Sequence, residues 1–189
     1  MFAKDMKIRT ADVSDAQALL EIYKPYVRNT AITFEYDVPE LADFRKRIEN
    51  TLKKYPYIVA EADGEILGYA YTGAFKERAA YDWSAEVSIY VKKDKRGLGI
   101  GGKLYAVLEE ISRAQHILNL NACIAYADTE DTYLTNDSVT FHSHMGYKMV
   151  GKFHQCGYKF GRWYDMVWME KMVGEHPADP APVIAFPNL

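Results

Sequence analysis

Hydrophobic and polar residues alternate with a regular period along most of this chain, and the first part predicts a strand followed by a helix. Residues 7–9 alternate as a strand does, and residues 12–30 then carry apolar side chains at helical spacing. Ser14 and Gln17 have the S/T-x-x-E/Q spacing of a capping box, in which each side chain satisfies a free backbone N–H. We therefore expect this helix to begin near Ser14.

The next segment predicts a second helix and a hairpin. Pro39 is expected to open the helix, and residues 41–52 place four large apolar side chains on one face. Residues 57–61 and 66–71 both have strand character and flank an Asp63-Gly64 pair, which suits the positive φ angles of a tight turn. An antiparallel hairpin is therefore expected.

The second half alternates strands and helices around a glycine-rich turn. The pattern predicts strands at 85–91, 118–125, 147–153 and 162–170 and helices at 104–114 and 138–144, the latter ended by Gly146. The order β-α-α-β-β-β-α-β-α-β-β indicates a mixed sheet with helices on both faces, in the α/β (α+β) class. Residues 1–173 are expected to form a single domain, and residues 174–189, with four prolines, an extended tail.

Composition and charge exclude several classes of protein. The 189 residues are 49% hydrophobic and 26% charged, which is typical of a globular domain. The net charge of -3 provides no broad attraction for nucleic acid or an anionic membrane, and no apolar run reaches the roughly 18 residues of a membrane helix. Cys123 and Cys156 have neither zinc-site nor disulfide-framework spacing. Asp128, Glu130 and Asp131 lack metal-ligand spacing. We expect a cytoplasmic protein without a metal.

The strongest local signal is a glycine run between a strand and a helix. Residues 87–91 lead through a short connector to Arg96-Gly97-Leu98-Gly99-Ile100-Gly101-Gly102, which runs directly into residues 103–105. Glycines let the backbone approach an anion closely, and the free N–H groups at a helix start favour negative charge. This arrangement predicts a pyrophosphate-binding turn.

Two better-known phosphate loops fit less well. A Walker loop needs Gly-Lys-Ser/Thr, whereas Gly102 and Lys103 are followed by Leu104. A dinucleotide fingerprint usually comes early in a βαβ repeat and has an acidic residue about 20 positions later, whereas residues 118–124 carry no acid.

The motif Arg96-x-x-Gly99-x-Gly101 resembles the Q/R-x-x-G-x-G/A motif of the GNAT acetyltransferases, which is also preceded by a strand. The resemblance implies a mostly antiparallel mixed sheet and acetyl-CoA as cosubstrate. It also implies that main-chain groups contact coenzyme A: Ile89, Tyr90 and Val91 along the pantetheine, and Arg96, Gly97, Leu98, Gly99, Ile100, Gly101 and Gly102 around the pyrophosphate.

A second block, residues 136–147, resembles the segment of that family beside the CoA thiol, N-x-x-S-x-x-[FL]-[YH]-x-x-x-G-[FY]. Ser138, His142 and Gly146 keep the family spacing, but Asn136 lies one residue closer to the serine than usual. Asn136 and Ser138 are the implied pantetheine contacts, and His142 takes the position where many members carry a tyrosine acid.

Two further stretches, residues 76–83 leading into Glu86 and residues 157–165, resemble phosphinothricin acetyltransferases in particular, as does Thr33-Phe34-Glu35. The likeness implies transfer of acetyl to the amine of a small amino-acid-like molecule of the phosphinothricin or methionine sulfone type. Glu86 is the implied general base, because the attacking amine must lose a proton. His142 or a nearby tyrosine is the implied proton donor to the thiolate.

The residues expected to bind the acceptor come from three separate stretches. An arginine can hold a carboxylate or phosphinate through two parallel hydrogen bonds, so Arg78 is the candidate anion contact and Phe34 an apolar wall. The remaining candidates are Glu35, Tyr81 and Trp163.

Alternatives to this function are a protein or peptide N-terminal acetyltransferase and a non-catalytic CoA-binding module. A homodimer is expected, because the aromatic-rich hairpin at Gly161-Arg162-Trp163 resembles a dimer-forming element of the family.

Overall fold

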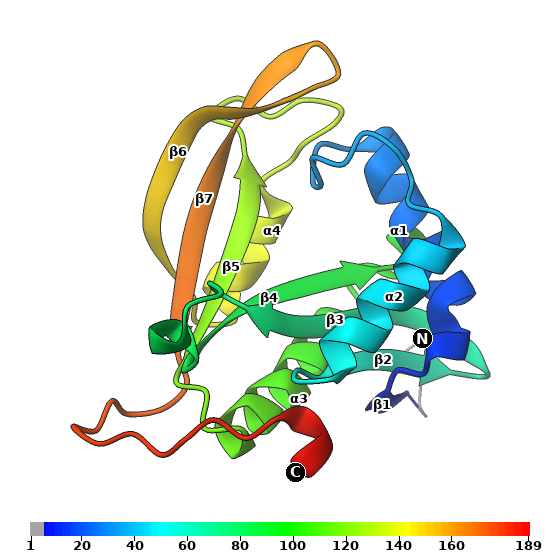
Figure 1. Cartoon of the computed structure of the whole chain (residues 1–189). Helices are drawn as coiled ribbons and strands as arrows, with labels where there is room; N and C mark the ends of the chain where they lie inside the picture. The colour runs from blue at the N-terminus through cyan, green and yellow to red at the C-terminus, as the bar shows by residue number, and fades with distance from the viewer. Residues whose placement is uncertain (1–5) are drawn as a thin grey trace.

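A computed structural model describes residues 6–189 and shows a seven-stranded sheet in the order β1-β2-β3-β4-β5-β7-β6 (Figure 1). Residues 1–5, where the predicted domain starts, lie outside the described residues. The strands are β1 Lys7–Thr10, β2 Tyr57–Ala62, β3 Glu65–Ala74, β4 Ser84–Val91, β5 Asn119–Tyr126, β6 Lys148–Lys159 and β7 Arg162–Met172. The helices are α1 Ala16–Asn29, α2 Leu41–Leu52, α3 Ile100–Ala114 and α4 Asp137–His144. This confirms the predicted mixed, mostly antiparallel class.

The one parallel pairing divides the sheet into two halves. β4 and β5 pair through three residue pairs, from Ser84 opposite Asn119 to Glu86 opposite Asn121, and then diverge. All other neighbouring strands are antiparallel. β1–β4 form one half and β5–β7 the other, and Figure 1 shows the two halves opening away from each other above their junction.

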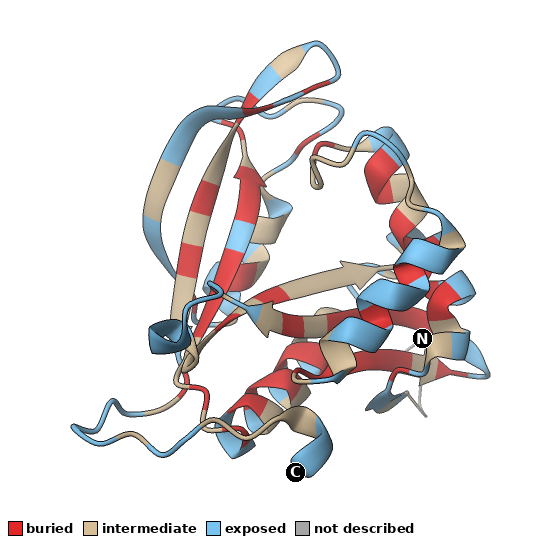
Figure 2. Ribbon diagram, in the orientation of Figure 1, coloured by how far each residue is buried: buried red, intermediate tan, exposed pale blue. Residues whose placement is uncertain are grey.

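Helices cover both faces of the first half, as the sequence predicted. α1 and α2 pack on one face through a core that includes Leu19, Phe44, Ile48 and Tyr69, and α3 packs on the other face through Leu104 and neighbouring side chains. Figure 2 shows the buried residues of α1 and α3 turned towards the sheet. Burial of these side chains contributes about 1.5–3 kcal/mol for each large one.

The start of each of these helices differs from the prediction. The capping box lies at Asp12 and Asp15, not at Ser14 and Gln17: the Asp12 carboxylate accepts from the Ser14 N–H, and the Asp15 carboxylate accepts from the Asp12 N–H at 2.8 Å. Two aspartates accept these bonds, one each, as well as the expected pair would, and the box opens the 3-10 turn Val13–Asp15 that precedes α1. Pro39 lies before Glu40, the N-cap of α2. α3 begins at Ile100, four residues before the predicted start, so Gly101 and Gly102 form its first turn.

The β6–β7 hairpin is longer than the sequence indicated, because β6 continues to Lys159 rather than ending at residue 153. A register irregularity between Phe153 and Gly157 interrupts the pairing, and the hairpin closes through Phe160 and Gly161, both at positive φ. Much of β6 is exposed on the left of Figure 2. β6 is therefore an edge strand with little covering it.

Residues 174–189 run back along the base of the fold. The Trp83 Nε1 donates to Ala181 O at 2.8 Å, and the buried Gln115 amide donates to both Lys54 O and Ile184 O. The segment ends in a short 3-10 helix, Phe186–Asn188. These bonds attach the C-terminal segment to the start of β4 and the end of α3. No helix within residues 6–189 has the length and apolar run needed to cross a membrane.

Candidate functional site

A cavity of about 540 Å³ opens where the end of β4, the start of α3 and α4 meet. Its position follows from the divergence of β4 and β5, since a side-by-side strand would otherwise fill the space. The cavity is lined by Tyr26, Ile32, Ile89, Val91, Lys95, Arg96, Gly97, Gly99, Ile100, Gly101, Gly102, Thr135, Asp137, Ser138 and Phe141. Most residues of the predicted glycine turn therefore lie in one wall.

The glycine turn has the geometry of an anion-binding helix start. Gly97 and Gly99 have φ angles of 77° and 76°, in the left-handed region that L-residues avoid. Gly99 is the N-cap of α3, and among the described residues no side chain caps this end. The first amides of α3 therefore have N–H groups available for an acceptor, and the helix dipole favours negative charge there. These features fit a diphosphate such as that of coenzyme A.

Gly101 is needed for a different reason, close packing. A Cβ at this position would lie 3.0 Å from the Phe141 ring of α4. The absence of a side chain lets α3 approach α4 and keeps the wall of the cavity in place.

Tyr26 is a part of this site that the sequence analysis missed. Its hydroxyl donates to Val91 O at 2.5 Å and accepts from Val91 N at 3.3 Å, and the Arg96 guanidinium lies 5.2 Å from its ring centroid. Tyr26 therefore contacts the end of β4 at Val91 and the start of the glycine turn at Arg96. Because 65 residues separate Tyr26 from Val91, no local motif predicts this contact.

A second, smaller cavity of about 70 Å³ lies between the diverging strands. Ile32, Ile89 and Ser138 line both cavities, so the two adjoin. The smaller one is lined by Ile32, Val87, Ser88, Ile89, Tyr90, Tyr105, Ala122, Cys123, Ile124, Ala125, Leu134, Ser138 and His142. Ser138, His142 and Tyr90 are thus brought together, along with Tyr105 and Cys123, to which the sequence analysis assigned no role.

His142 is buried and bonded at both ring nitrogens. Nδ1 lies 2.7 Å from Ser138 O, which can only accept, so Nδ1 carries the proton. Nε2 therefore accepts from the Tyr105 hydroxyl at 2.8 Å. Burial lowers the pKa of His142. The ring is consequently neutral at pH 7, with no proton on the nitrogen that faces Tyr105.

Glu86 lies on β4 at the last pair before the strands diverge, opposite Asn121. Burial raises the pKa of the Glu86 carboxyl above its ordinary value, and the Lys76 ammonium partly offsets this effect. Cys123 lines the smaller cavity. Desolvation of the Cys123 thiol raises its pKa to about 11, and the nearby Glu86 charge adds to this effect. Glu86 is therefore a partly desolvated carboxylate at the point where β4 and β5 part, the vertex of the cleft between the two halves of the sheet. It is not among the lining residues of either cavity, but it lies near Cys123, whose thiol stays protonated at neutral pH.

The loop between α1 and α2 carries Phe34 and Glu35. The Phe34 ring lies against Gly157 of β6 and 6.4 Å from the Tyr164 ring centroid. Glu35 pairs with Arg47 at 2.7 Å and accepts from the Tyr23 hydroxyl at 3.1 Å. Phe34 thus contacts the opposite half of the sheet, whereas Glu35 is held by α1 and α2.

The other predicted acceptor contacts lie on the surface and line neither cavity. Arg78 is exposed at the start of the 3-10 helix Ala79–Tyr81, and within residues 6–189 no acidic side chain forms an ion pair with it. Tyr81 is 42% exposed and packs on Phe75, and Trp163 is 56% exposed and packs on Tyr158. Of these three residues, only Arg78 carries a charge, and it is available to an acceptor anion.

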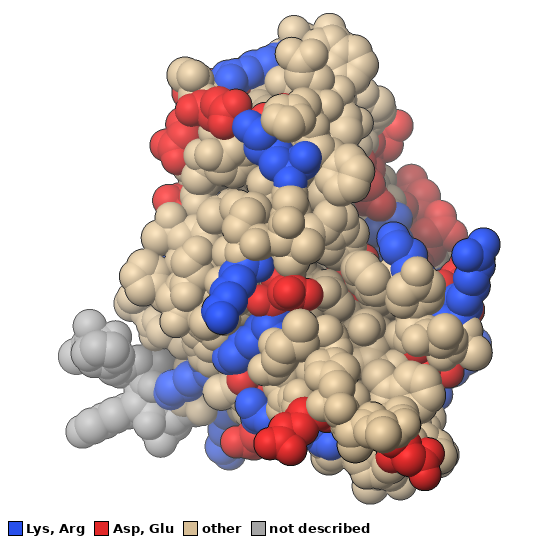
Figure 3. All heavy atoms as spheres, turned by 90° about the vertical axis from the view of Figure 1, so that its left-hand side faces the viewer, with Lys and Arg blue, Asp and Glu red and all other residues tan. Residues whose placement is uncertain are grey.

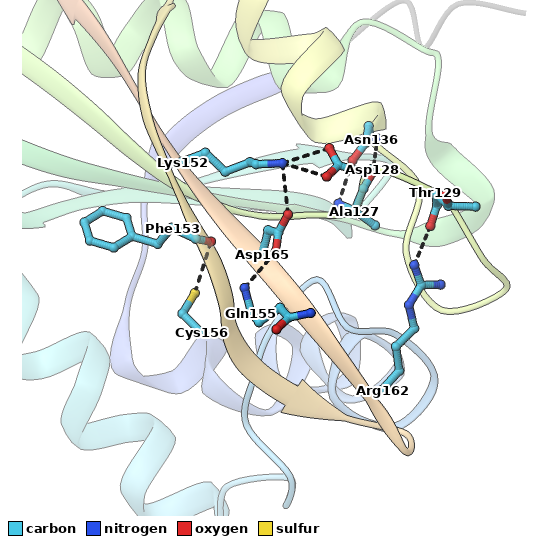
Figure 4. A network of polar contacts seen from close by, with 10 residues as sticks. All are labelled: Ala127, Asp128, Thr129, Asn136, Lys152, Phe153, Gln155, Cys156, Arg162 and Asp165. Carbon is cyan, nitrogen blue, oxygen red and sulfur yellow. Dashed lines mark hydrogen bonds and ion pairs between the residues drawn. The ribbon is translucent and has the colours of Figure 1, made fainter.

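Two predicted coenzyme contacts have other surroundings. Leu98 is 40% exposed on the outside of the glycine turn. The Asn136 amide donates to Ala127 O at 2.9 Å and accepts from Ala127 N at 3.3 Å (Figure 4). Asn136 therefore joins the start of α4 to the end of β5, while its neighbours Thr135 and Asp137 line the larger cavity.

Across residues 6–189, no group of three or more His, Cys, Asp or Glu side chains is placed to hold a metal ion.

Comparison with known proteins gives consistent matches over nearly the whole chain. Residues 8–168 match the Acetyltransferase (GNAT) domain family. The chain is 33% identical over 165 residues to an L-methionine sulfoximine/L-methionine sulfone acetyltransferase of Pseudomonas aeruginosa. The match covers 86% of this chain and 92% of that protein.

Two solved structures are similar at the level of the fold and the sequence. One is a GNAT superfamily phosphinothricin acetyltransferase from Sinorhizobium meliloti in complex with acetyl-CoA, with a TM-score of 0.84, 32% identity and 93% of each chain covered. The other is a ribosomal-protein-alanine N-acetyltransferase from Brucella melitensis, with a TM-score of 0.80, 34% identity and coverage of 88% of this chain and 99% of that one.

Proposed function

The chain belongs to the GNAT acetyltransferases and is an acetyl-CoA-dependent N-acetyltransferase, and from this premise we propose that Glu86 is the general base for direct transfer to the α-amine of a small amino-acid analogue. The acceptor class is that of phosphinothricin and methionine sulfone, which the names of the relatives support. The observation that carries the proposal is the partly desolvated Glu86 carboxylate at the vertex of the cleft, where β4 and β5 part.

Glu86 has the chemistry that a base needs here. The thioester of acetyl-CoA supplies the activated acetyl group. An α-amine is largely protonated near neutral pH and attacks only after losing that proton. A carboxylate with a raised pKa accepts the proton more readily than an ordinary one, directly or through one water. Glu86 therefore prepares the nucleophile, and the proton it takes leaves to solvent along the open cleft.

His142 as proton donor to the thiolate stays a prediction. In the tautomer described above, Nδ1–H is used by Ser138 O and Nε2 accepts from Tyr105. Donation from Nε2 requires a second ring proton, which burial disfavours. The geometry supports a role for His142 in orienting Ser138 and Tyr105 at the junction of the two cavities.

Recognition of the acceptor is assigned to groups on two loops, the α1–α2 loop and the β3–β4 loop. Phe34 supplies an apolar surface from the α1–α2 loop, and the exposed Arg78 supplies a cation for a carboxylate or phosphinate. Lys76, whose charge acts on Glu86, is a second cation on the same loop.

Release of the CoA thiol tests the proposal. The purified protein is given acetyl-CoA with L-phosphinothricin, methionine sulfone, the common amino acids or a peptide with an N-terminal alanine. We expect turnover with the first two. The likeness to the ribosomal-protein-alanine enzyme supports the second candidate, a peptide N-terminal acetyltransferase. Turnover of the peptide alone would decide for that candidate, and no turnover of any amine would reject both.

A homodimer through the β6 edge is also proposed. β6 ends the sheet order and exposes Met149, Val150 and Phe153 at 49%, 59% and 55%. Figure 3, which faces this side of the molecule, shows wide areas without charged groups. An apolar, unpaired edge strand is a typical pairing surface. Sedimentation should give a dimer, and Phe153→Glu should shift it to monomer whereas Leu189→Glu, at the exposed C-terminus, should not.

A cytoplasmic location is likewise proposed. Cys123 and Cys156 are both free thiols, which suits a reducing compartment. Fractionation of the source cells tests this directly.

A further inference from the structure

Lys159 is a buried cation at the end of β6 that the proposed chemistry does not use. The residue is 3% exposed, and its ammonium donates to three backbone carbonyls: Val27 O at 2.8 Å, Thr30 O at 2.9 Å and Thr33 O at 2.8 Å. An ammonium has three N–H donors, so all of them are used. A buried charge is costly unless it is fully hydrogen-bonded, and here three neutral carbonyls satisfy it.

The three carbonyls belong to the end of α1 and the loop that follows. Val27 lies in the last turn of α1, where carbonyls have no partner within the helix and the dipole favours a cation. Thr30 is the C-cap, and Thr33 lies just before Phe34. Lys159 therefore gathers residues 27–33 around one point and sets where the chain continues to Phe34.

The two residues before Lys159 contact the same loop. A Cβ on Gly157 would lie 2.3 Å from the Phe34 ring, so the ring sits directly on the glycine backbone. The Tyr36 hydroxyl donates to Tyr158 O. Three consecutive residues of β6 thus hold the loop segment 33–36 by three different contacts.

These contacts join the two halves of the molecule at their open side. The loop follows α1, which packs on β1–β4, whereas β6 belongs to the half formed by β5–β7. The halves also meet through three β4–β5 residue pairs at the vertex of the cleft, where Phe75 packs on Trp168, and near the loop, where Ala31 N donates to Tyr133 O at 2.9 Å. Figure 1 shows the loop after α1 and the β6–β7 hairpin together at the upper, open end of the molecule.

We propose that Lys159 is a positioning residue for acceptor binding: by tying residues 27–33 to the end of β6, its ammonium fixes Phe34 across the open side of the cleft. The inference rests on the proposed function, because Phe34 is assigned there to the acceptor. None of the three bonds involves the glycine turn proposed to bind the diphosphate, although Ile32, within the tied segment, lines both cavities. Because Lys159 acts through the position of Phe34, we expect its effect on acceptor binding to exceed its effect on acetyl-CoA binding.

The test compares Lys159→Met with Lys148→Met, the same change at an exposed lysine on the same strand. We expect Lys159→Met to raise the acceptor KM by about tenfold or more, because three bonds to the loop are lost, with the acetyl-CoA KM within about threefold. Lys148→Met should match the wild type. An acceptor KM for Lys159→Met equal to that of the wild type, in an enzyme that turns over, would overturn the inference.

Amide hydrogen exchange gives a readout that does not need turnover. In Lys159→Met, exchange over residues 30–37 should rise while exchange over α3 and β5 stays at the wild-type level. Unchanged exchange over 30–37 contradicts the inference whatever the activity. Absence of turnover in the wild type rejects the proposed function alone, so the two failures are distinguishable.

Gly157→Ala covers the case in which Lys159→Met does not fold. The added methyl displaces the Phe34 ring but leaves the three carbonyls on Lys159. We expect a raised acceptor KM with wild-type exchange over residues 27–33. A wild-type acceptor KM in Gly157→Ala would show that the place of Phe34 does not matter, which also overturns the inference. Gly151→Ala, where a Cβ meets nothing within 4 Å, is the matched control.

Discussion

The Glu86 carboxyl gives a prediction about pH. Because burial raises its pKa, the carboxylate is lost at a higher pH than for an ordinary glutamate as the solution is acidified. Only the ionised form accepts a proton, so kcat should fall as the pH drops through this raised pKa and reach a plateau above it. The titration of the acceptor amine lies at higher pH and acts on kcat/KM.

Glu86→Gln should remove this acid limb and lower kcat by about 100-fold or more, which is the usual contribution of a general base. The acetyl-CoA KM should stay within about twofold, since the glycine turn proposed to bind the diphosphate is untouched. The check is steady-state thiol release between pH 5 and 9. Glu49→Gln, at an exposed position on α2, is the control, and a Glu86→Gln enzyme with a wild-type acid limb would contradict the assignment.

The start of α3 gives a prediction at the scale of one element. Gly101→Val places side-chain atoms against the Phe141 ring, where a Cβ alone would lie at 3.0 Å. Overpacking of this kind costs about 1–3 kcal/mol. A shift of α3 away from α4 would relieve the overpacking but would distort the glycine turn at the start of α3. We expect the acetyl-CoA KM to rise by about tenfold, with a smaller change in the acceptor KM.

Titration with acetyl-CoA measures this effect directly, and Gly151→Val, on β6, is the control. Wild-type affinity for acetyl-CoA in Gly101→Val would show that the contact between α3 and Phe141 does not shape the cavity.

The elements also show how far sequence reasoning reaches. The β2–β3 hairpin follows from alternation and from Asp63-Gly64, whose φ angles of 52° and 75° are those of the expected turn. The start of α3 was placed too late, because Gly101 and Gly102 have low helix propensity yet occupy its first turn. β6 was ended too early, because the irregularity between Phe153 and Gly157 breaks the alternation on which the prediction depends.

The site likewise contains some features that could be predicted from the sequence and others that could not. Gly97, Gly99 and Gly101 form a local motif, so the glycine turn in one wall of the larger cavity could be predicted from sequence. Tyr26 and Lys159 could not, because their partners are 65 residues away in one case and 126 to 132 in the other. Both contacts join a side chain to backbone carbonyls. Because every residue type has a backbone carbonyl, the partners cannot be recognised from the sequence.

At the scale of the whole molecule, one buried amide, that of Gln115, helps to hold the C-terminal segment, together with bonds such as Trp83 Nε1 to Ala181 O and Phe186 N to Lys54 O. Gln115 is fully buried, and its Nε2 donates to Lys54 O at 2.8 Å and Ile184 O at 2.9 Å. Gln115→Ala leaves both carbonyls without this donor, and an unsatisfied buried acceptor costs about 1–3 kcal/mol. We expect the free energy of unfolding to fall by about that amount.

Denaturant unfolding measures the loss, with Gln17→Ala, at an exposed position on α1, as the control. Equal stability of Gln115→Ala and the wild type would show that the Gln115 amide contributes little to holding the C-terminal segment.

The central claim is that the cleft between the two halves of the sheet brings the amine of the acceptor to Glu86. A crystal structure with coenzyme A and methionine sulfone bound tests it most directly. The account predicts the diphosphate on the amides of residues 97–102 and the acceptor nitrogen within about 3.2 Å of a Glu86 oxygen, or one water away. An acceptor bound with its nitrogen on any other side chain, out of reach of Glu86, would contradict the account.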